Sequence, residues 1–122
     1  MSPINFDLLR AEYPEFGEVW SALQGWFERN RRKRYVELSA LLRALPDVDK
    51  VQAVLAFQKM LERGMLATAY KVKSPSGDLL EGEYDWPDDV PDRLPARDHS
   101  HYVDTDEADI VSGYRWEPVG AS

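Results

Sequence analysis

The sequence predicts a small α+β domain in which helices come first and β-strands follow. Two observations support this class. Apolar residues recur at helical spacing up to about residue 64, and from residue 66 they alternate with polar residues. The chain has 122 residues, of which 43% are apolar, and this is enough to build the core of one compact domain.

The N-terminal third is expected to form two helices. The first opens with Ser2 as N-cap and Pro3 at the first helical position, and it ends near Ala11 because Tyr13-Pro14 disfavours helical angles. The second runs from about Gly17 to Asn30. Its apolar residues form one largely aromatic face that is expected to be core: Val19, Trp20, Leu23, Trp26 and Phe27.

Two further helices are expected before the strands. The third runs from about Val36 to Ala44 and ends before Pro46. The fourth is capped by Asp47 and ends at Gly64. One of its sides carries Val51, Val54, Leu55, Leu61 and Met65 and is expected to be buried. The opposite, exposed face would then carry Asp49, Gln52, Ala56, Lys59 and Arg63.

Alternating patterns in residues 66–73 and 79–86 predict two strands. The turn signal at residues 74–78 lies between them, so we expect a β-hairpin. Residues 110–116 repeat the pattern and can supply another strand. Between residues 86 and 95, prolines recur every fourth position and predict an extended or turn-rich connector without regular secondary structure.

Helices followed by a hairpin resemble a winged helix-turn-helix domain over about residues 17–86. Residues 36–42 resemble the second helix of that family, residues 47–63 its recognition helix, and residues 61–66 the usual close of that helix. The resemblance implies a winged-helix domain over residues 1–86, with a Pro-rich, acidic extension of residues 87–122 packing on it. It also implies that the fourth helix and the wing can contact DNA, or that the domain docks onto another protein.

Charge is unevenly distributed. Residues 1–73 carry twelve Lys and Arg against nine Asp and Glu, whereas residues 74–122 carry three against thirteen, and the whole chain has a net charge of −7. The pI of about 4.8 disfavours nucleic acid, because domains that bind it usually have a pI above about 9. The acidic segment is expected either to face a basic partner or basic cluster, or simply to keep the domain soluble.

Candidate partner- or nucleic-acid-binding residues lie in three places. Gln52, Lys59 and Arg63 lie on the fourth helix, where Gln52 can contact adenine and the two cations can contact phosphates or complement the helix dipole. Lys71 and Lys73 lie on the first wing strand, where they can touch a DNA backbone or pair with acids across the hairpin. Four consecutive cations between two helices can hold phosphates or form an exposed turn: Arg31, Arg32, Lys33 and Arg34.

No catalytic motif is evident. The chain has no cysteine, which excludes disulfides and thiol catalysis. Asp98, His99, His101 and Asp104 superficially resemble a metal cluster, but the glycine of a calcium loop is missing, so a hydrated acidic loop is expected instead. We therefore expect no metal, no cofactor, no small-molecule substrate and no enzymatic activity.

These observations lead to two functional hypotheses. The first is a non-enzymatic winged-helix interaction module that docks onto another protein or complex, and the alternative is a winged-helix DNA-binding transcriptional regulator. No apolar run approaches the length of a membrane span, and residues 1–7 lack the pattern of a signal peptide. A cytoplasmic location without membrane contact is therefore expected.

Overall fold

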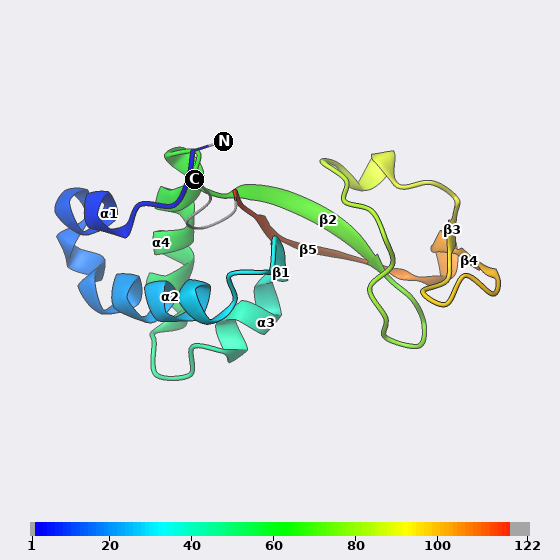
Figure 1. Cartoon of the computed structure of the whole chain (residues 1–122), viewed down its shortest axis with the longest axis horizontal. Coiled ribbons are helices and arrows are strands. Elements are labelled where there is room, and N and C mark those ends of the chain that lie inside the picture. Colours follow the sequence, from blue (N-terminus) through cyan, green and yellow to red (C-terminus); the bar gives the residue numbers. More distant parts are fainter. Residues whose placement is uncertain (1, 118–122) are drawn as a thin grey trace. The chain divides into compact units, whose positions relative to one another are not determined.

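The computed structural model describes residues 2–117 (Figure 1). They fall into two compact units: the first comprises residues up to 67 together with those from 114 onward, and the second comprises residues 68–113. The change in composition after residue 86 falls inside the second unit, and the division into residues 1–86 and 87–122 remains a prediction. Residues 118–122 of the expected extension lie outside the described residues.

Helices dominate the first unit. They are α1 (Phe6–Glu12), the 3₁₀ helix η1 (Pro14–Phe16), α2 (Gly17–Arg29), α3 (Leu38–Arg43) and α4 (Lys50–Glu62). The predicted bounds of α2 are confirmed to within one residue at its end. The break at Tyr13-Pro14 is confirmed too, because Pro14 opens η1 after α1 has ended.

The predicted start of α1 is wrong. Its N-cap is Asn5, whose side-chain oxygen accepts a hydrogen bond from the backbone N–H of Leu8 at 3.1 Å. The backbone N–H of Ser2 instead donates to the carbonyl oxygen of Gly64 at 2.8 Å. The N-terminal segment is therefore held to the end of α4, and this bond takes Ser2 away from a capping role.

Two helix starts in the middle of the first unit also differ from prediction. Residues 35–37 form the strand β1 (Tyr35–Glu37), so α3 begins at Leu38. The cap of α4 is Asp49 and not Asp47: the Asp49 carboxylate accepts hydrogen bonds from the backbone N–H groups of Val51 and Gln52, at 2.9 and 3.1 Å. Both aspartates fit the capping pattern in sequence, and Asp49 caps because its extended backbone directly precedes the helix.

Gly64 closes α4 as predicted. Its φ of +70° is a left-handed conformation that favours glycine. The N–H of Gly64 donates to the carbonyl of Leu61, and the N–H of Met65 donates to that of Met60, at 3.0 and 2.9 Å. This pair of bonds is the Schellman arrangement that satisfies the last carbonyls of a helix. The chain then enters the strand β2 (Ala67–Lys73).

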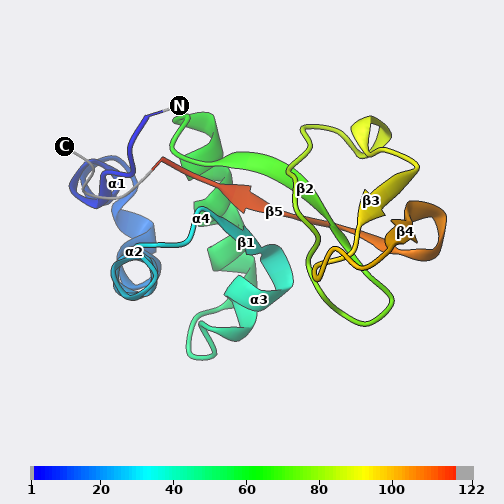
Figure 2. The ribbon, with the colours of Figure 1, turned by 45° about the vertical axis from the view of Figure 1, so that its right-hand side comes forward.

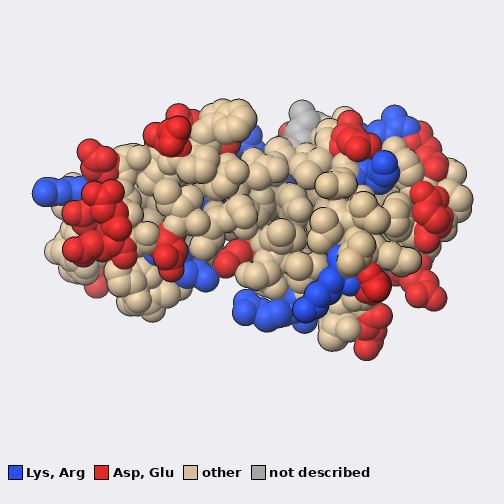
Figure 3. Space-filling model, turned by 180° about the vertical axis from the view of Figure 1, so that it is seen from behind, with Lys and Arg blue, Asp and Glu red and all other residues tan. Residues whose placement is uncertain are grey.

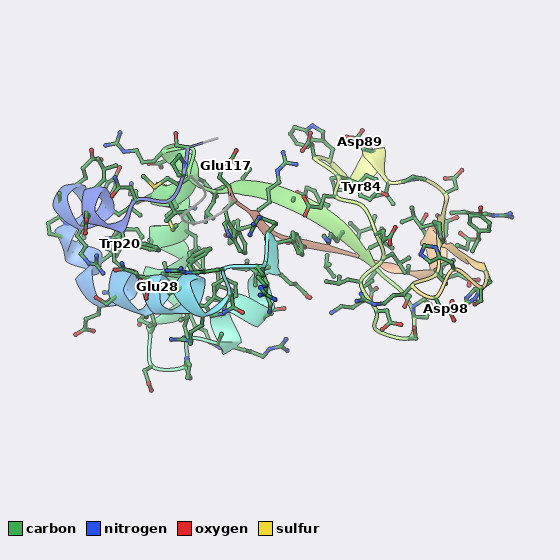
Figure 4. All side chains as sticks on the ribbon, in the orientation of Figure 1. Trp20, Glu28, Tyr84, Asp89, Asp98 and Glu117 are labelled. Carbon is green, nitrogen blue, oxygen red and sulfur yellow. The ribbon has the colours of Figure 1, made fainter. Side chains whose placement is uncertain are left out.

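Aromatic side chains form the centre of the first core. Every residue of the predicted α2 aromatic face is buried. Phe27 packs edge-on against both Trp26 and Trp116, with ring centroids 5.0 and 4.9 Å apart. Trp20, labelled in Figure 4, donates its indole N–H to the carbonyl oxygen of Tyr13 at 2.9 Å. The expectation that these rings form core is confirmed.

A three-stranded sheet has the strand order β1-β5-β2, and its strands can be followed in Figures 1 and 2. The expected strand at residues 110–116 is confirmed as β5 (Asp109–Arg115). The predicted strand at 79–86 is wrong, because that segment meets β2 only through the isolated bridges Tyr70↔Tyr84 and Lys73↔Leu79. Gly82, at φ +107°, bends the backbone between these two bridges, and a longer ladder cannot form there.

The second unit has a small core of its own. Its strands β3 (Arg93–Pro95) and β4 (Tyr102–Asp104) pair antiparallel, with Leu94 opposite Val103. The prolines were expected to exclude regular structure, and this is wrong for Pro95, which ends β3 in a two-stranded sheet, and for Pro87, which opens the 3₁₀ helix η2 (Pro87–Asp89). A further 3₁₀ helix, η3 (Thr105–Glu107), follows β4. The buried residues of this core are Val72, Leu80, Leu94, Ala96 and Val103.

Candidate functional site

The predicted buried side of α4 is wrong at three of its five positions, whereas Met65 is buried and Leu61 packs against the core as predicted. Val51, Val54 and Leu55 are exposed by 69, 36 and 42%, although they were assigned to the buried side. The buried side carries Ala53, Ala56, Phe57 and Met60, so Ala56 does not belong to an exposed face. We call Val51, Val54 and Leu55 the α4 apolar face.

The error has a physical cause. Apolar residues occur on both sides of α4, so hydrophobicity alone does not identify the buried side. The small side chains of Ala53 and Ala56 let the helix backbone approach the rest of the core, which Phe57 and Met60 then fill.

The polar candidates of α4 have separate surroundings. Gln52 is exposed near the start of the helix, beside the α4 apolar face. Lys59 forms an ion pair with Glu62 at 3.6 Å, and its ammonium nitrogen lies 5.5 Å from the centre of the Tyr13 ring. Arg63 forms an ion pair with Glu12 of α1. Both cations therefore already interact within the first unit.

Arg31, Arg32, Lys33 and Arg34 form an exposed connection between α2 and β1, which we call the basic connection. The Arg34 guanidinium donates to the carbonyl oxygens of Arg31 and Lys33, at 2.6 and 2.9 Å. These bonds fold the connection into a turn and leave the other three cationic groups facing solvent. A shallow hollow of about 300 Å³ runs from Glu28 to Lys33 beside it (Glu28 is labelled in Figure 4).

Lys71 and Lys73 lie on β2 in the second unit, and both are half-buried. Each of them already takes part in an interaction within the structure, so neither is a free cation. The structure thus distributes the nine predicted binding residues over three places: α4 with its C-cap Arg63, the basic connection, and β2.

The His- and Asp-rich segment forms a hydrogen-bonded loop between β3 and β4. The Ser100 hydroxyl donates to the Asp98 carboxylate at 2.7 Å and lies 2.8 Å from the Nδ1 atom of His101. The Ser100 hydroxyl and backbone N–H lower the pKa of Asp98, whose place in this loop is labelled in Figure 4. Across residues 2–117, no three His, Asp or Glu side chains gather in a way that suits a metal ion.

A hollow of about 700 Å³ lies in the second unit, and sequence reasoning did not identify it. It is lined by side chains from the 74–80 turn, from the loop between β3 and β4, and from β4 and η3. These segments are up to 33 positions apart in sequence, from Ser74 to Glu107, so no local pattern could reveal that they share a cavity.

Comparisons with protein-family models, with curated proteins and with solved structures gave no match to this chain. Within the described residues, no helix combines the length and the apolar character needed to cross a membrane.

Proposed function

We propose that the chain is a winged-helix interaction module that docks onto another protein through the α4 apolar face. In this proposal α2, α3 and α4 are the three helices of the module. β2 and β5 are its wing strands, and β5 takes the role that the sequence suggested for residues 79–86. Three observations support this architecture: the order of the helices, the Schellman turn at Gly64, and the adjacency of β2 and β5 in one sheet.

The observation that carries the proposal is the chemistry of the exposed side of α4. A helix that reads a DNA groove presents hydrogen-bonding side chains to base edges and cations to phosphates. On the exposed part of α4, Val51, Val54 and Leu55 form an apolar stripe at spacings i, i+3 and i+4, next to exposed polar residues of the same helix. Such a stripe matches the way one helix packs its apolar side chains against another protein, and it is poorly suited to phosphate.

Burying the α4 apolar face in a partner interface would contribute favourable binding free energy. Each of the three side chains leaves apolar surface in water, and burying one in a partner interface contributes about 1–2 kcal/mol. Because 1.4 kcal/mol corresponds to about a tenfold change in affinity, two such side chains can account for roughly a hundredfold. The partner is therefore expected to present an apolar surface of similar size.

The proposal is tested with the double variant Val51→Glu/Leu55→Glu. Both positions are exposed, and an acid at Val51 lies in the first turn of α4, where the helix dipole favours it, so the fold is expected to persist. Proteins captured by the wild-type chain from nuclease-treated lysate are identified, and the affinity of the purified partner is measured by calorimetry. The variant is expected to bind it at least about tenfold more weakly.

The matched control is Leu8→Glu, which places the same acid at a similarly exposed leucine on α1. Circular dichroism and a thermal melt establish that both variants are folded. If the Leu8 and α4 variants weaken the partner equally, or if neither weakens it, the α4 apolar face is not the docking surface.

A second candidate function is nucleic-acid binding through the basic connection. It is favoured by three consecutive exposed cations, Arg31, Arg32 and Lys33. Anisotropy of a labelled DNA duplex, measured at about 50 and 200 mM salt, tests it: each phosphate contact contributes about −0.9 to the slope of log affinity against log salt. The triple variant Arg31→Gln/Arg32→Gln/Lys33→Gln should then flatten the slope, while Arg43→Gln/Lys50→Gln should not. Negligible wild-type binding at the lower salt concentration would remove this candidate.

A further inference from the structure

The second unit carries a strong excess of negative charge. Residues 68–113 contain twelve Asp and Glu and four Lys and Arg, whereas the rest of the chain contains ten acids and eleven bases. Figure 3 shows acidic side chains gathered over this unit on the face in view. Like charges at this density repel one another, and a cationic ligand would relieve that repulsion.

The hollow of the second unit combines this charge with an apolar floor. Leu80, Ala96 and Val103 line it and are buried in the small core beneath. Four carboxylates also line it, and all are exposed: Asp78, Asp98, Asp104 and Glu107. A hollow with an apolar floor and an acidic rim has the chemistry that a lysine or arginine side chain needs, since such a side chain buries its aliphatic stem and keeps its charged end at the surface.

An exposed aromatic ring completes the lining. Residues alternate along β4, so Val103 points into the core while Tyr102 is 70% exposed at the hollow. A cation held near such a ring is attracted to its face. Arg97 and His101 are the basic members of the lining. The Arg97 guanidinium donates to the carbonyl oxygen of Leu79 at 3.3 Å, and His101 lies within hydrogen-bond distance of Ser100, so both have partners inside the unit.

We propose that this hollow binds lysine or arginine side chains from an extended, basic segment of a partner protein. The site is distinct from the α4 apolar face and goes beyond the function proposed above. A protein segment is the occupant because the apolar floor, the acidic rim and the Tyr102 ring together suit a long aliphatic cation. The negative charge of the second unit also extends beyond the hollow, where it can attract the basic residues that flank the bound side chain.

The proposal is tested with the full chain and a fluorescein-labelled peptide that carries three arginines spaced by glycine and serine. Binding is followed by anisotropy at about 50 mM salt. The variant Asp78→Asn/Glu107→Gln removes two rim charges while retaining side-chain shape, and it is expected to weaken the peptide about fivefold or more. Its control, Asp88→Asn/Asp89→Asn, removes the same charge from η2, outside the hollow, and is expected to change affinity less than about twofold.

A second pair of variants tests the aromatic wall. Tyr102→Leu is expected to weaken peptide binding about two- to fivefold, whereas Trp86→Leu, at a similarly exposed aromatic outside the hollow, should leave it unchanged. Amide shifts of Leu80, Ala96 and Val103 on peptide addition give a readout that is independent of affinity. Spermine is used to test whether a free polyamine, which is also a polycation, binds the hollow as well as the peptide does. We expect spermine to bind more weakly than the peptide.

Three results would overturn the proposal: equal weakening by the hollow variant and the η2 variant, absence of peptide binding at low salt, or spermine binding as tight as the peptide. None of these depends on α4. The Val51→Glu/Leu55→Glu variant should bind the peptide normally, so failure of the two proposals can be told apart.

Discussion

Gly64 joins the last turn of α4 to the first residues of β2, and its backbone conformation can be tested separately from its packing. A Cβ atom at this position would meet no atom within 4 Å, so Gly64→Ala creates no clash and adds only the strain of a positive φ. We expect a loss of about 1–2 kcal/mol in the free energy of unfolding, measured by urea titration.

Gly17 provides the matched control. It opens α2 in the right-handed helical region, at φ −52° and ψ −44°, and a Cβ there also meets no atom within 4 Å. Gly17→Ala should therefore stabilise the fold by about 0.4–1 kcal/mol. Equal effects at the two glycines would contradict the assigned turn.

Tyr114 predicts a pH dependence of stability. Its burial in the first core raises its pKa above the ordinary value of 10.0. Because the folded state holds the proton more tightly than the unfolded state does, the associated stability is fully present below about pH 10 and is lost as pH rises through the folded pKa. Urea unfolding between about pH 8 and 11 should show this loss, and Tyr114→Phe should reduce it. An unchanged pH profile in the variant would exclude Tyr114 as its source.

At the scale of the element, α4 depends on its N-cap. Asp49→Ala removes the acceptor for two backbone N–H groups and is expected to cost about 0.5–2 kcal/mol of unfolding free energy. Asp47→Ala, two residues earlier and exposed, is expected to stay within about 0.5 kcal/mol. Chemical denaturation of both variants distinguishes the observed cap from the one that the sequence first suggested.

Elements with a strong local signal could be predicted from sequence. The aromatic periodicity of α2, the glycine after α4 and the alternation in β5 each appear in a few consecutive residues. The wrong predictions concern features that depend on tertiary packing. Residues 79–86 alternate as a strand does, yet the glycine at 82 bends them, and the neighbour of β2 in the sheet is β5, which begins 36 positions after β2 ends.

The candidate sites were less predictable for the same reason. Sequence reasoning looked for cations and found Lys59 and Arg63, which pair within the first unit. The exposed valines and leucine of α4 were assigned to the core, because a helix with apolar residues on both sides does not reveal which side is buried. The hollow of the second unit depends on tertiary proximity alone.

At the scale of the molecule, the two units should differ in local stability. Nineteen buried residues form the first core and five the second, among those that the structure describes, and the second unit also carries the acidic excess. We expect the amides of β3 and β4 to exchange hydrogen faster than those of α2. Raising salt from about 20 to 200 mM should slow β3 and β4 more, because it screens repulsion among the acids. Uniform exchange and a uniform salt response would contradict this division.

The three-stranded sheet also allows the segment between β2 and β5 to change in length. The chain leaves β2 at Lys73 and returns at Asp109 into the strand beside it (Figure 1), so the intervening stretch begins and ends on neighbouring strands. Lengthening or shortening a segment between such anchors costs little, since closure entropy grows only slowly with loop length. Relatives should accordingly differ most in length between positions 73 and 109, while the helices stay the same.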